Sequence, residues 1–151
     1  MKKITRTLPS KKRIALVAHD GMKHDLLIWV QRNLSALQNH QLVATSTTAQ
    51  YLSMNTPLHL ERLSSGPMGG DQQIGARITE GEIDVLVFFW DPLDAHPHQF
   101  DVIALLRLAT VWNIPVATNP SSADLLFGNH QLGEVMPITI PDTPTCVYQQ
   151  R

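Results

Sequence analysis

The sequence predicts an α/β protein of three layers, α/β/α, in which helices cover both faces of a mainly parallel, five-stranded sheet. Short apolar runs alternate along the chain with segments whose apolar residues recur at helical spacing. Runs such as Ile14–Ala18 hold no polar residue, which is typical of a strand buried on both faces. Because parallel strands need crossover connections, this alternation favours a parallel sheet with helices on both sides.

Each element follows from a local pattern of apolar, turn and capping residues. The five strands are predicted at residues 14–18, 41–44, 58–63, 84–90 and 114–118, with 138–140 as a last, edge strand. Helices are predicted where apolar residues have a helical period or where capping residues stand, at 22–37, from 48 through 52, at 74–78, at 102–112 and from 119 onward. No internal repeat interrupts this order.

Length and composition indicate one globular domain, 1–151, with a basic, solvated arm at 1–12 and an irregular tail at 141–151. The chain is 43% hydrophobic and 17% charged with a net charge of -1, so it has no basic excess for binding nucleic acid. The apolar run after the arm is too short for a signal peptide or a membrane span, and we expect a cytoplasmic protein. The single cysteine, Cys146, cannot form an internal disulfide.

The predicted helix 102–112 is apolar on two sides. One face carries Val102, Leu105, Leu106, Ala109 and Trp112, and another carries Ile103, Leu108 and Val111. Such a helix needs two burial partners, of which the sheet is one. We therefore predict that a second copy of the chain covers the other face and that the protein is a homo-oligomer.

The glycine-rich stretch Ser64–Gly75 is the first candidate site. Glycines ahead of a helix start let backbone N–H groups turn toward an anion at the positive end of the helix dipole. Asp71 would repel that anion unless it has a task, so we interpret the stretch as a phosphate cradle that holds a general base. The alternative is a glycine-rich turn with Asp71 as an ordinary N-cap.

Polar clusters follow the other predicted strands. Thr45, Ser46, Thr47 and Thr48 come directly after 41–44 and offer hydroxyl and backbone donors to an anion, or form an ST-turn with an N-cap. His19 and Asp20 follow 14–18, and residues 91–101 follow 84–90. Because the carboxyl ends of parallel strands meet at one edge of a sheet, we expect these groups to form one site.

The spacing of residues argues against several chemistries at this site, because no zinc ligand motif, nucleophile elbow or nucleotide-binding glycine motif occurs. A metal held by His96, His98 and the carboxylates Asp91, Asp94 and Asp101 is one alternative. We favour the hypothesis that the site carries out metal-free acid–base chemistry on a small phosphorylated molecule.

The chain resembles methylglyoxal synthase from about Arg6 to Ala123. The resemblance is carried by Leu16-Val17-Ala18-His19-Asp20, Ser65-Gly66-Pro67-Met68-Gly69-Gly70-Asp71-Gln72-Gln73, Phe88-Phe89-Trp90-Asp91-Pro92-Leu93, Pro97-His98 with Asp101, and the segments 105–109 and 113–119. It implies a homohexameric α/β lyase that converts dihydroxyacetone phosphate to methylglyoxal and inorganic phosphate through an enediolate, with no metal or organic cofactor. It also implies regulation by inorganic phosphate.

The resemblance also implies a role for each matching residue. It implies Asp71 as the base that removes a C3 proton and His98 as an imidazole near the substrate oxygens. Asp20, Asp91 and Asp101 match carboxylates that support the site. The matching substrate and phosphate contacts are His19, Lys23, Thr45, Thr47, Thr48, Ser65 and Gly66, and Ser46, within the same run of hydroxyl residues, is expected to bind phosphate with them.

Two departures from the family pattern concern phosphate binding. Ser46 stands where the family usually has Gly, which matters if the position needs a positive φ. Arg151 stands next to the position of the family's C-terminal phosphate-binding Arg, in a tail without a helical pattern. His24 and His96 are predicted to be solvated histidines without a role.

Two other functions compete with the synthase. A domain of the same fold can be a non-catalytic module that senses phosphate or a nucleotide. A metal-dependent phosphohydrolase would use the residues from His96 to Asp101.

Overall fold

The computed structural model describes residues 1–143 and is built around a five-stranded sheet in the order β4-β3-β2-β5-β6. Every pairing within this sheet is parallel. The strands are β2 (Arg13–Ala18), β3 (Gln41–Ala44), β4 (Glu61–Arg62), β5 (Val85–Phe89) and β6 (Val116–Ala117). The fold class predicted from the sequence is confirmed.

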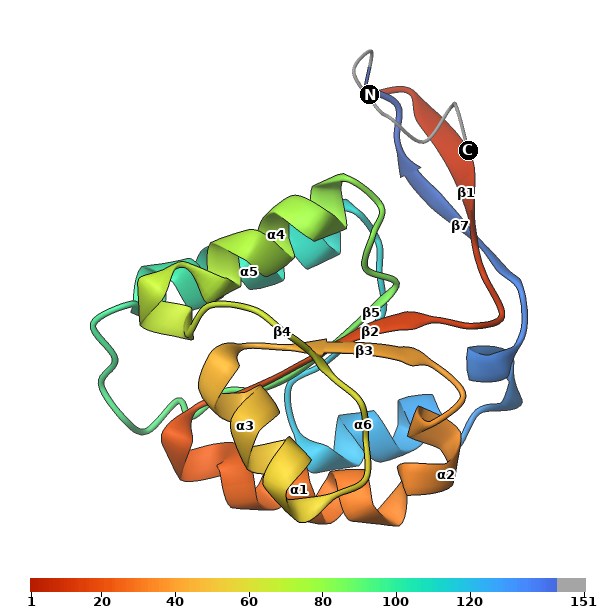
Figure 1. The fold of residues 1–151 in the computed structure, drawn as a ribbon. Helices are drawn as coiled ribbons and strands as arrows, with labels where there is room; N and C mark the ends of the chain where they lie inside the picture. The colour runs from red at the N-terminus through yellow and green to blue at the C-terminus, as the bar shows by residue number, and fades with distance from the viewer. Residues whose placement is uncertain (144–151) are drawn as a thin grey trace.

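Helices lie in a layer on each side of the sheet (Figure 1). One layer holds α1 (Lys23–Arg32), α2 (Leu34–Leu37), α3 (Ser46–Asn55) and α6 (Pro120–Phe127), and the other holds α4 (Gly70–Thr79) and α5 (Gln99–Val111). The short 3-10 helices are η1 (Asp20–Met22), η2 (Gly66–Met68) and η3 (His130–Gly133).

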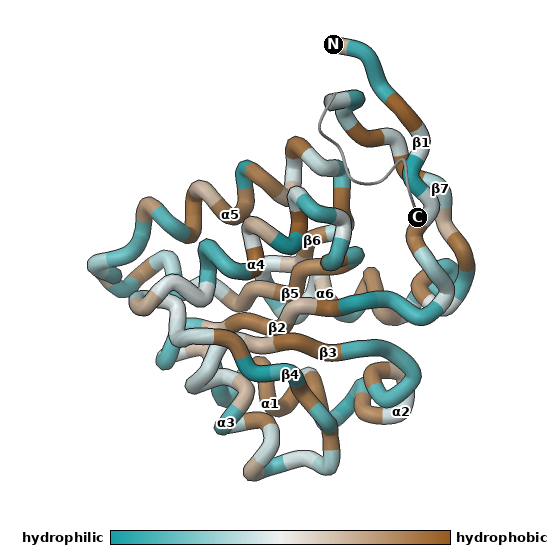
Figure 2. Tube along the Cα trace, turned by 45° about the horizontal axis from the view of Figure 1, so that its top comes forward, coloured by the Kyte–Doolittle hydropathy of each residue, from teal (hydrophilic) through white to brown (hydrophobic). Residues whose placement is uncertain are grey.

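Alternation along the central strands divides the core in two. Ile14 and Leu16 of β2 belong to the cluster formed with α1, α2, α3 and α6, whereas Ala15 and Val17 belong to the cluster formed with α4 and α5. Both sets of side chains are buried, and Figure 2 shows β2 and β3 as hydrophobic segments. This double burial is why the strands are unbroken apolar runs in the sequence.

The prediction that residues 1–12 form a solvated arm is wrong. Residues of β1 (Lys3–Leu8) pair antiparallel with β7 (Met136–Pro141), and Leu8 is fully buried. The same pairing removes the expected edge strand at 138–140 from the main sheet, because β1 and β7 form a two-stranded ribbon of their own. Figure 1 shows this ribbon standing away from the helix layers, with the N-terminus at its tip.

Other boundaries differ by a few residues. Of the predicted strand 58–63, only the residues of β4 pair with a neighbouring strand, and of 114–118 only those of β6 do. Each of these two strands lies at an edge of the sheet and has a single neighbour. Of the expected irregular tail at 141–151, Pro141 ends β7, and residues 144–151, with Cys146 and Arg151, lie outside the described part of the chain.

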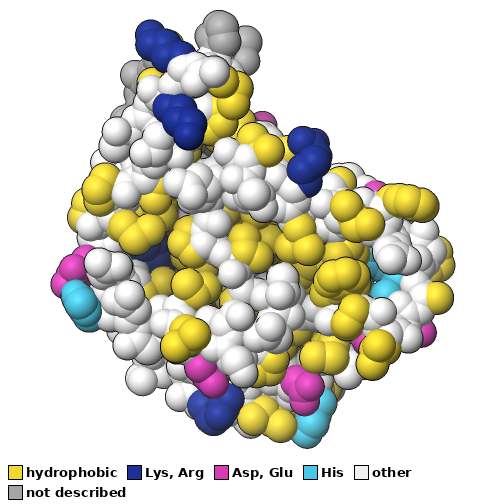
Figure 3. All heavy atoms as spheres, turned by 180° about the vertical axis from the view of Figure 1, so that it is seen from behind, with side chains coloured by type: hydrophobic (Ala, Val, Ile, Leu, Met, Phe, Trp, Pro, Cys, Tyr) yellow, Lys and Arg dark blue, Asp and Glu magenta, His cyan; other side chains and the backbone are white. Residues whose placement is uncertain are grey.

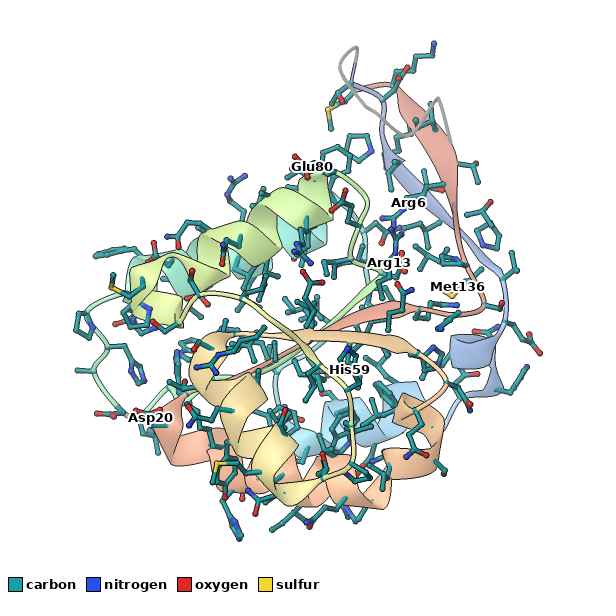
Figure 4. The ribbon with its side chains drawn as sticks, viewed as in Figure 1. Arg6, Arg13, Asp20, His59, Glu80 and Met136 are labelled. Atoms are coloured by element: carbon teal, nitrogen blue, oxygen red, sulfur yellow. The ribbon has the colours of Figure 1, made fainter. Side chains whose placement is uncertain are left out.

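A buried ion cluster joins the ribbon to the sheet. The Asp84 carboxylate is fully buried and accepts hydrogen bonds from Arg6 Nη2 at 2.6 Å and from Arg13 Nη2 at 3.0 Å. The Arg13 backbone N–H and Nε donate to the other Asp84 oxygen at 2.8 and 3.0 Å. Figure 4 shows Arg6 and Arg13 at the base of the ribbon, far from Asp20 across the sheet.

We expect Asp84→Asn to lower the free energy of unfolding by about 3–5 kcal/mol, because it leaves two arginines beside a neutral buried group. Denaturant unfolding at one protein concentration measures this loss. Asp142→Asn, which breaks the Lys2–Asp142 pair on an exposed lysine, is the control and should have little effect. Equal effects of the two substitutions would contradict the role given to Asp84.

Candidate active site

A cavity of about 160 Å³ opens at the carboxyl edge of the sheet, where β2, β3 and β5 end. Eight of the residues predicted for the site line it: His19, Asp20, Lys23, Thr45, Thr47, Gly66, Asp71 and His98. Loops that are far apart in sequence therefore converge as the topology of a parallel sheet requires. Val17, Ala18, Pro67, Asp94 and His96 complete the lining.

The glycine-rich stretch places Asp71 at the base of this cavity. Gly69 is the N-cap of α4 with a φ of 108°, a conformation that favours glycine, so the alternative in which Asp71 is the N-cap is wrong. A Cβ on Gly70 would lie 2.1 Å from the Ser64 carbonyl oxygen, which leaves no room for any side chain. Asp71 follows in the first turn of α4 and is only 2% exposed.

The Asp71 carboxylate faces the imidazole of His98 without pairing with it. The distance from Asp71 Oδ2 to His98 Nε2 is 3.9 Å, which exceeds a hydrogen bond. Neither Asp71 Oδ2 nor His98 Nδ1 has a hydrogen-bond partner among the described residues. Burial raises the pKa of the Asp71 carboxyl, an effect that His98 opposes and Asp101 reinforces.

Gly66 keeps the space between these two groups open. A Cβ on Gly66 would lie 3.3 Å from His98 Nε2 and 3.4 Å from Asp71 Oδ2. A buried carboxylate and an imidazole that share an opening, each with unused hydrogen-bonding capacity, can transfer a proton to or from a ligand placed between them.

His19 presents a hydrogen-bond donor to the cavity. Its Nδ1 accepts a hydrogen bond from the Asp91 backbone N–H at 3.1 Å, so in the neutral ring the proton is on Nε2. This Nε2 is buried and has no partner in the described chain. Burial first, and then the neighbouring His96 and His98, lower the pKa of His19 to about 4, so the ring is neutral at pH 7.

Lys23 brings the cation of the site. Its Nζ donates to the Ala18 carbonyl at 3.2 Å and forms an ion pair with Asp20 at 2.5 Å. This hydrogen bond from Lys23 lowers the pKa of the Asp20 carboxyl, whose side chain is 95% exposed at the rim of the cavity. Figure 4 shows Asp20 at this end of the molecule. One ammonium proton remains for a ligand.

The four hydroxyl residues after β3 differ in whether they line the cavity. Thr45 and Thr47 line the cavity at the first turn of α3. Thr48 is buried, and its hydroxyl lies 3.4 Å from both the N and O of Ala18 and accepts from Thr45 Oγ1 at 3.3 Å. Thr45 is the N-cap of α3 but makes no side-chain capping bond, so the hydroxyl of Thr45 does not serve as a cap.

Ser46 does not line the cavity. Its Oγ accepts hydrogen bonds from Arg62 Nε at 2.9 Å and Nη2 at 2.7 Å, and its backbone N–H donates to the Ser64 carbonyl at 3.3 Å. Among the described non-glycine residues, only Asn113 has a positive φ, so this position accepts serine without strain. Ser46 thus connects α3 to the segment that leads into the glycine-rich stretch.

The remaining predicted residues, Ser65, Asp91 and Asp101, are not among those that line the cavity. Ser65 is the N-cap of η2, and its carbonyl accepts from the N–H groups of Met68 and Gly70 at 3.0 and 2.8 Å. Asp91 contacts the site through its backbone N–H to His19. Asp101, half-buried in the first turn of α5, acts on Asp71 through its charge.

The expectation that His96 is a solvated histidine is wrong. Its ring packs on the ring of His19 with centroids 3.8 Å apart, and it lines the cavity. His24 is exposed on α1, as expected. The sequence marked His96 only as part of the polar segment 91–101 that follows a predicted strand, because no local pattern predicts the path of the irregular loop that turns it inward.

Within residues 1–143, no group of three or more His, Cys, Asp or Glu side chains is placed to hold a metal ion. The cluster from His96 to Asp101 is thus not assembled as a metal site in this part of the chain. The same residues include no helix with the length and hydrophobicity that crossing a bilayer demands.

A parallel α/β domain with a buried carboxylate and an imidazole at the carboxyl edge of its sheet has the construction of an α/β enzyme that carries out acid–base chemistry. The family model for the MGS-like domain matches residues 25–118. The chain belongs to the methylglyoxal synthase family.

Individual relatives agree along nearly the whole chain. Methylglyoxal synthases from Vibrio parahaemolyticus and Vibrio campbellii are 58% and 57% identical over 142 residues, which cover 94% of this chain and 94% of each relative. The crystal structure of methylglyoxal synthase from Elizabethkingia anophelis is 42% identical, with a TM-score of 0.89, and the match covers 98% of this chain and 96% of that one. None of these relatives is named as a sensing module.

The low pKa of His19 leads to a test by pH. In the folded protein His19 takes up its proton near pH 4, compared with 6.5 for an unperturbed histidine. Between these values the unfolded chain binds the extra proton, so this group lowers the free energy of unfolding as the pH falls from 6.5 toward 4. An NMR titration of the His19 ring should show a midpoint near 4, and a midpoint at or above 6.5 would contradict the assignment.

Proposed function

We propose that this chain eliminates phosphate from dihydroxyacetone phosphate to give methylglyoxal, with Asp71 as the general base. The observation that carries the proposal is the buried, unpaired Asp71 Oδ2, which faces His98 across the opening at Gly66. Family membership supplies the substrate, because the relatives are named for the product that they synthesise.

Proton removal falls to Asp71. An exposed carboxylate is a weak base, whereas burial raises the pKa of Asp71 and so increases its affinity for a proton from carbon. The proton leaves C3, and the electron pair of the C–H bond forms the C=C bond of an enediolate. His98 stands 3.9 Å from the base and donates to the substrate oxygens, on which negative charge develops.

We assign phosphate binding to the donors of His19, of Lys23 and of the first turn of α3. His19 Nε2–H is unpaired, Lys23 supplies a positive charge, and Thr45 and Thr47 bring hydroxyl groups from the first turn of α3. Gly66 and Ser65 belong to the adjacent glycine-rich turn, Thr48 holds this turn of α3 against β2, and Ser46 holds it against Arg62. Together these groups form an anion site at a helix N-terminus.

The torsion about the bridging C–O bond decides the product. If this bond is perpendicular to the enediolate plane, its σ* orbital overlaps the π system: the C2=C3 pair forms a C1=C2 bond, the C1–O pair leaves with phosphate, and the C3 hydroxyl loses its proton to become the aldehyde. The enol formed in this way takes up a proton at C1, which becomes the methyl group of methylglyoxal. If the bond lies in the plane, phosphate is retained and the enediolate only isomerises. We propose that the hydroxyls of residues 45–48 and the cradle at residues 65 and 66 hold the phosphate out of the plane.

The three other carboxylates support these groups. Asp20 holds Lys23 in place through their ion pair, and the Asp91 backbone fixes the tautomer of His19. Asp101 raises the pKa of Asp71 further. The proposed reaction needs neither a metal ion nor an organic cofactor, because every proton transfer is assigned to a side chain.

Incubation with dihydroxyacetone phosphate, with and without EDTA, tests the reaction itself. Methylglyoxal and inorganic phosphate in equal amounts, unaffected by the chelator, are the expected products. Dihydroxyacetone in place of methylglyoxal, lost on chelation, would instead identify a metal-dependent phosphohydrolase, and binding without turnover would identify a sensing module.

We expect Asp71→Asn to abolish exchange of the C3 proton with solvent and to lower kcat by at least about 10³-fold, because it removes the base and retains the cradle. The dissociation constant of the substrate should change little. Glu80→Gln removes one carboxylate at the opposite end of α4, as Figure 4 shows, and should leave kcat unchanged. Turnover by Asp71→Asn within a few-fold of the unmodified protein would rule out this base.

We also propose that the protein is a homohexamer in which α5 contributes to a subunit contact. Three apolar side chains of α5 are exposed, namely Phe100 at 84%, Ile103 at 52% and Val111 at 41%. Figure 3, seen from behind, shows hydrophobic side chains gathered on this face of the molecule. An exposed apolar patch of this kind is typical of a protein–protein contact.

Substitution of Ile103 by Glu should lower the mass of the assembly in analytical ultracentrifugation, because it places a charge in the contact. Ile28→Glu makes the same change at a 42% exposed isoleucine of α1 and is the matched control. An unchanged mass for Ile103→Glu would remove α5 from the interface.

We further assign the protein to the cytoplasm and propose that inorganic phosphate regulates it allosterically. The donors that hold the substrate phosphate would also take the free ion. In the proposed homohexamer, phosphate bound in one subunit acts on the sites of the other subunits, which makes the effect allosteric. The role of Arg151 in that regulation lies outside the described residues.

A further inference from the structure

His96 is the cavity residue to which the proposed reaction gives no role. It belongs to the loop between β5 and α5, in which residues 92–95 and Pro97 are all exposed. His96 alone among them is half-buried, with its side chain in the wall of the cavity. His96, like His98 two residues later in the same loop, thus turns its imidazole toward the ligand site.

The position of this imidazole is fixed by its neighbours. Its ring lies against the ring of His19 with centroids 3.8 Å apart and planes 35° apart. The centroid of the His98 ring is 5.7 Å away, so His96 is on the His19 side of the cavity. Asp20 and Lys23 line the same cavity, and His96 interacts with Asp20 through charge.

The hydrogen bonds of His96 are incomplete. Its Nε2 is buried and has no partner within the described residues. A buried polar atom without a partner lowers stability, and it persists in a native protein where a ligand or water satisfies it. The neighbouring His19 Nε2 also lacks a partner in the described part of the chain, so two buried imidazole nitrogens on this side of the cavity are available to a ligand.

We propose that His96 is a substrate-binding residue that donates a hydrogen bond from Nε2 to the phosphate group. This inference rests on the proposed function, which supplies the ligand. A phosphate group has several acceptor oxygens and can take His96, His19 and Lys23 together. The carboxylates nearby do not prevent this, because Lys23 pairs with Asp20 and Asp94 is exposed to water.

Two substitutions separate the nitrogen of His96 from its ring. His96→Phe keeps an aromatic ring against His19 and removes the donor, whereas His96→Gln keeps an N–H donor and removes the ring. The probe is inorganic phosphate, titrated into each full-length protein in a calorimeter. His24→Gln, at an exposed histidine of α1, is the control for the loss of an imidazole.

We expect His96→Phe to raise the Kd for phosphate about tenfold or more, as for loss of a hydrogen bond to a charged group, and His96→Gln to raise it clearly less. The KM for dihydroxyacetone phosphate should follow the same order while kcat stays within a few-fold, because the contact acts on binding. His24→Gln should match the unmodified protein.

Three results would overturn the inference: an unchanged Kd for His96→Phe, a weakening by His96→Gln as large as that by His96→Phe, which would show that a retained N–H donor does not preserve binding, or no phosphate binding by the unmodified protein. Turnover separates this failure from that of the reaction. If the unmodified protein binds phosphate but makes no methylglyoxal, the proposed reaction fails and calorimetry still decides on His96.

Discussion

A carboxylate that is kept out of water and left without a full set of hydrogen bonds is the constraint on which this site depends. Water would stabilise the charged form of Asp71 and weaken it as a base, and a close partner would do the same. The glycine-rich stretch prevents both. Gly69 adopts a φ of 108° to start α4, Gly70 lets the chain pass the Ser64 carbonyl, and Gly66 leaves open the space before His98.

The two edges of the sheet have different tasks. At the amino edge, Asp84 is buried and satisfied by Arg6 and Arg13, which anchors the β1–β7 ribbon. At the carboxyl edge, Asp71 and the neighbouring imidazoles are buried and unsatisfied. Both edges hold buried charge, but the cavity at the carboxyl edge gathers several buried polar atoms without hydrogen-bond partners among the described residues, and these atoms are available to a ligand.

Local pattern predicted the central part of the fold, because β2, β3 and β5 are buried on both faces and their sequences are apolar except at the first residues of β2 and β3, Arg13 and Gln41. The ribbon was missed because β1 is largely exposed and its one buried charge, Arg6, is satisfied by Asp84, which is 78 residues away. Asp71 was predicted from the glycines around it and from the family resemblance. The packing of His96 on His19 could not be predicted, although the segment 91–101 was expected at the site, because only the path of an irregular loop brings the two rings together.

The titration of Asp71 in the ligand-free protein tests the central claim most directly. A ¹³C NMR titration of its side-chain carboxyl group reports the protonation of this residue alone. The account predicts a midpoint above 3.8, since burial outweighs the attraction of His98. A midpoint at or below 3.8 would show an ordinary, stabilised carboxylate and would contradict the assignment of Asp71 as a base strengthened by burial.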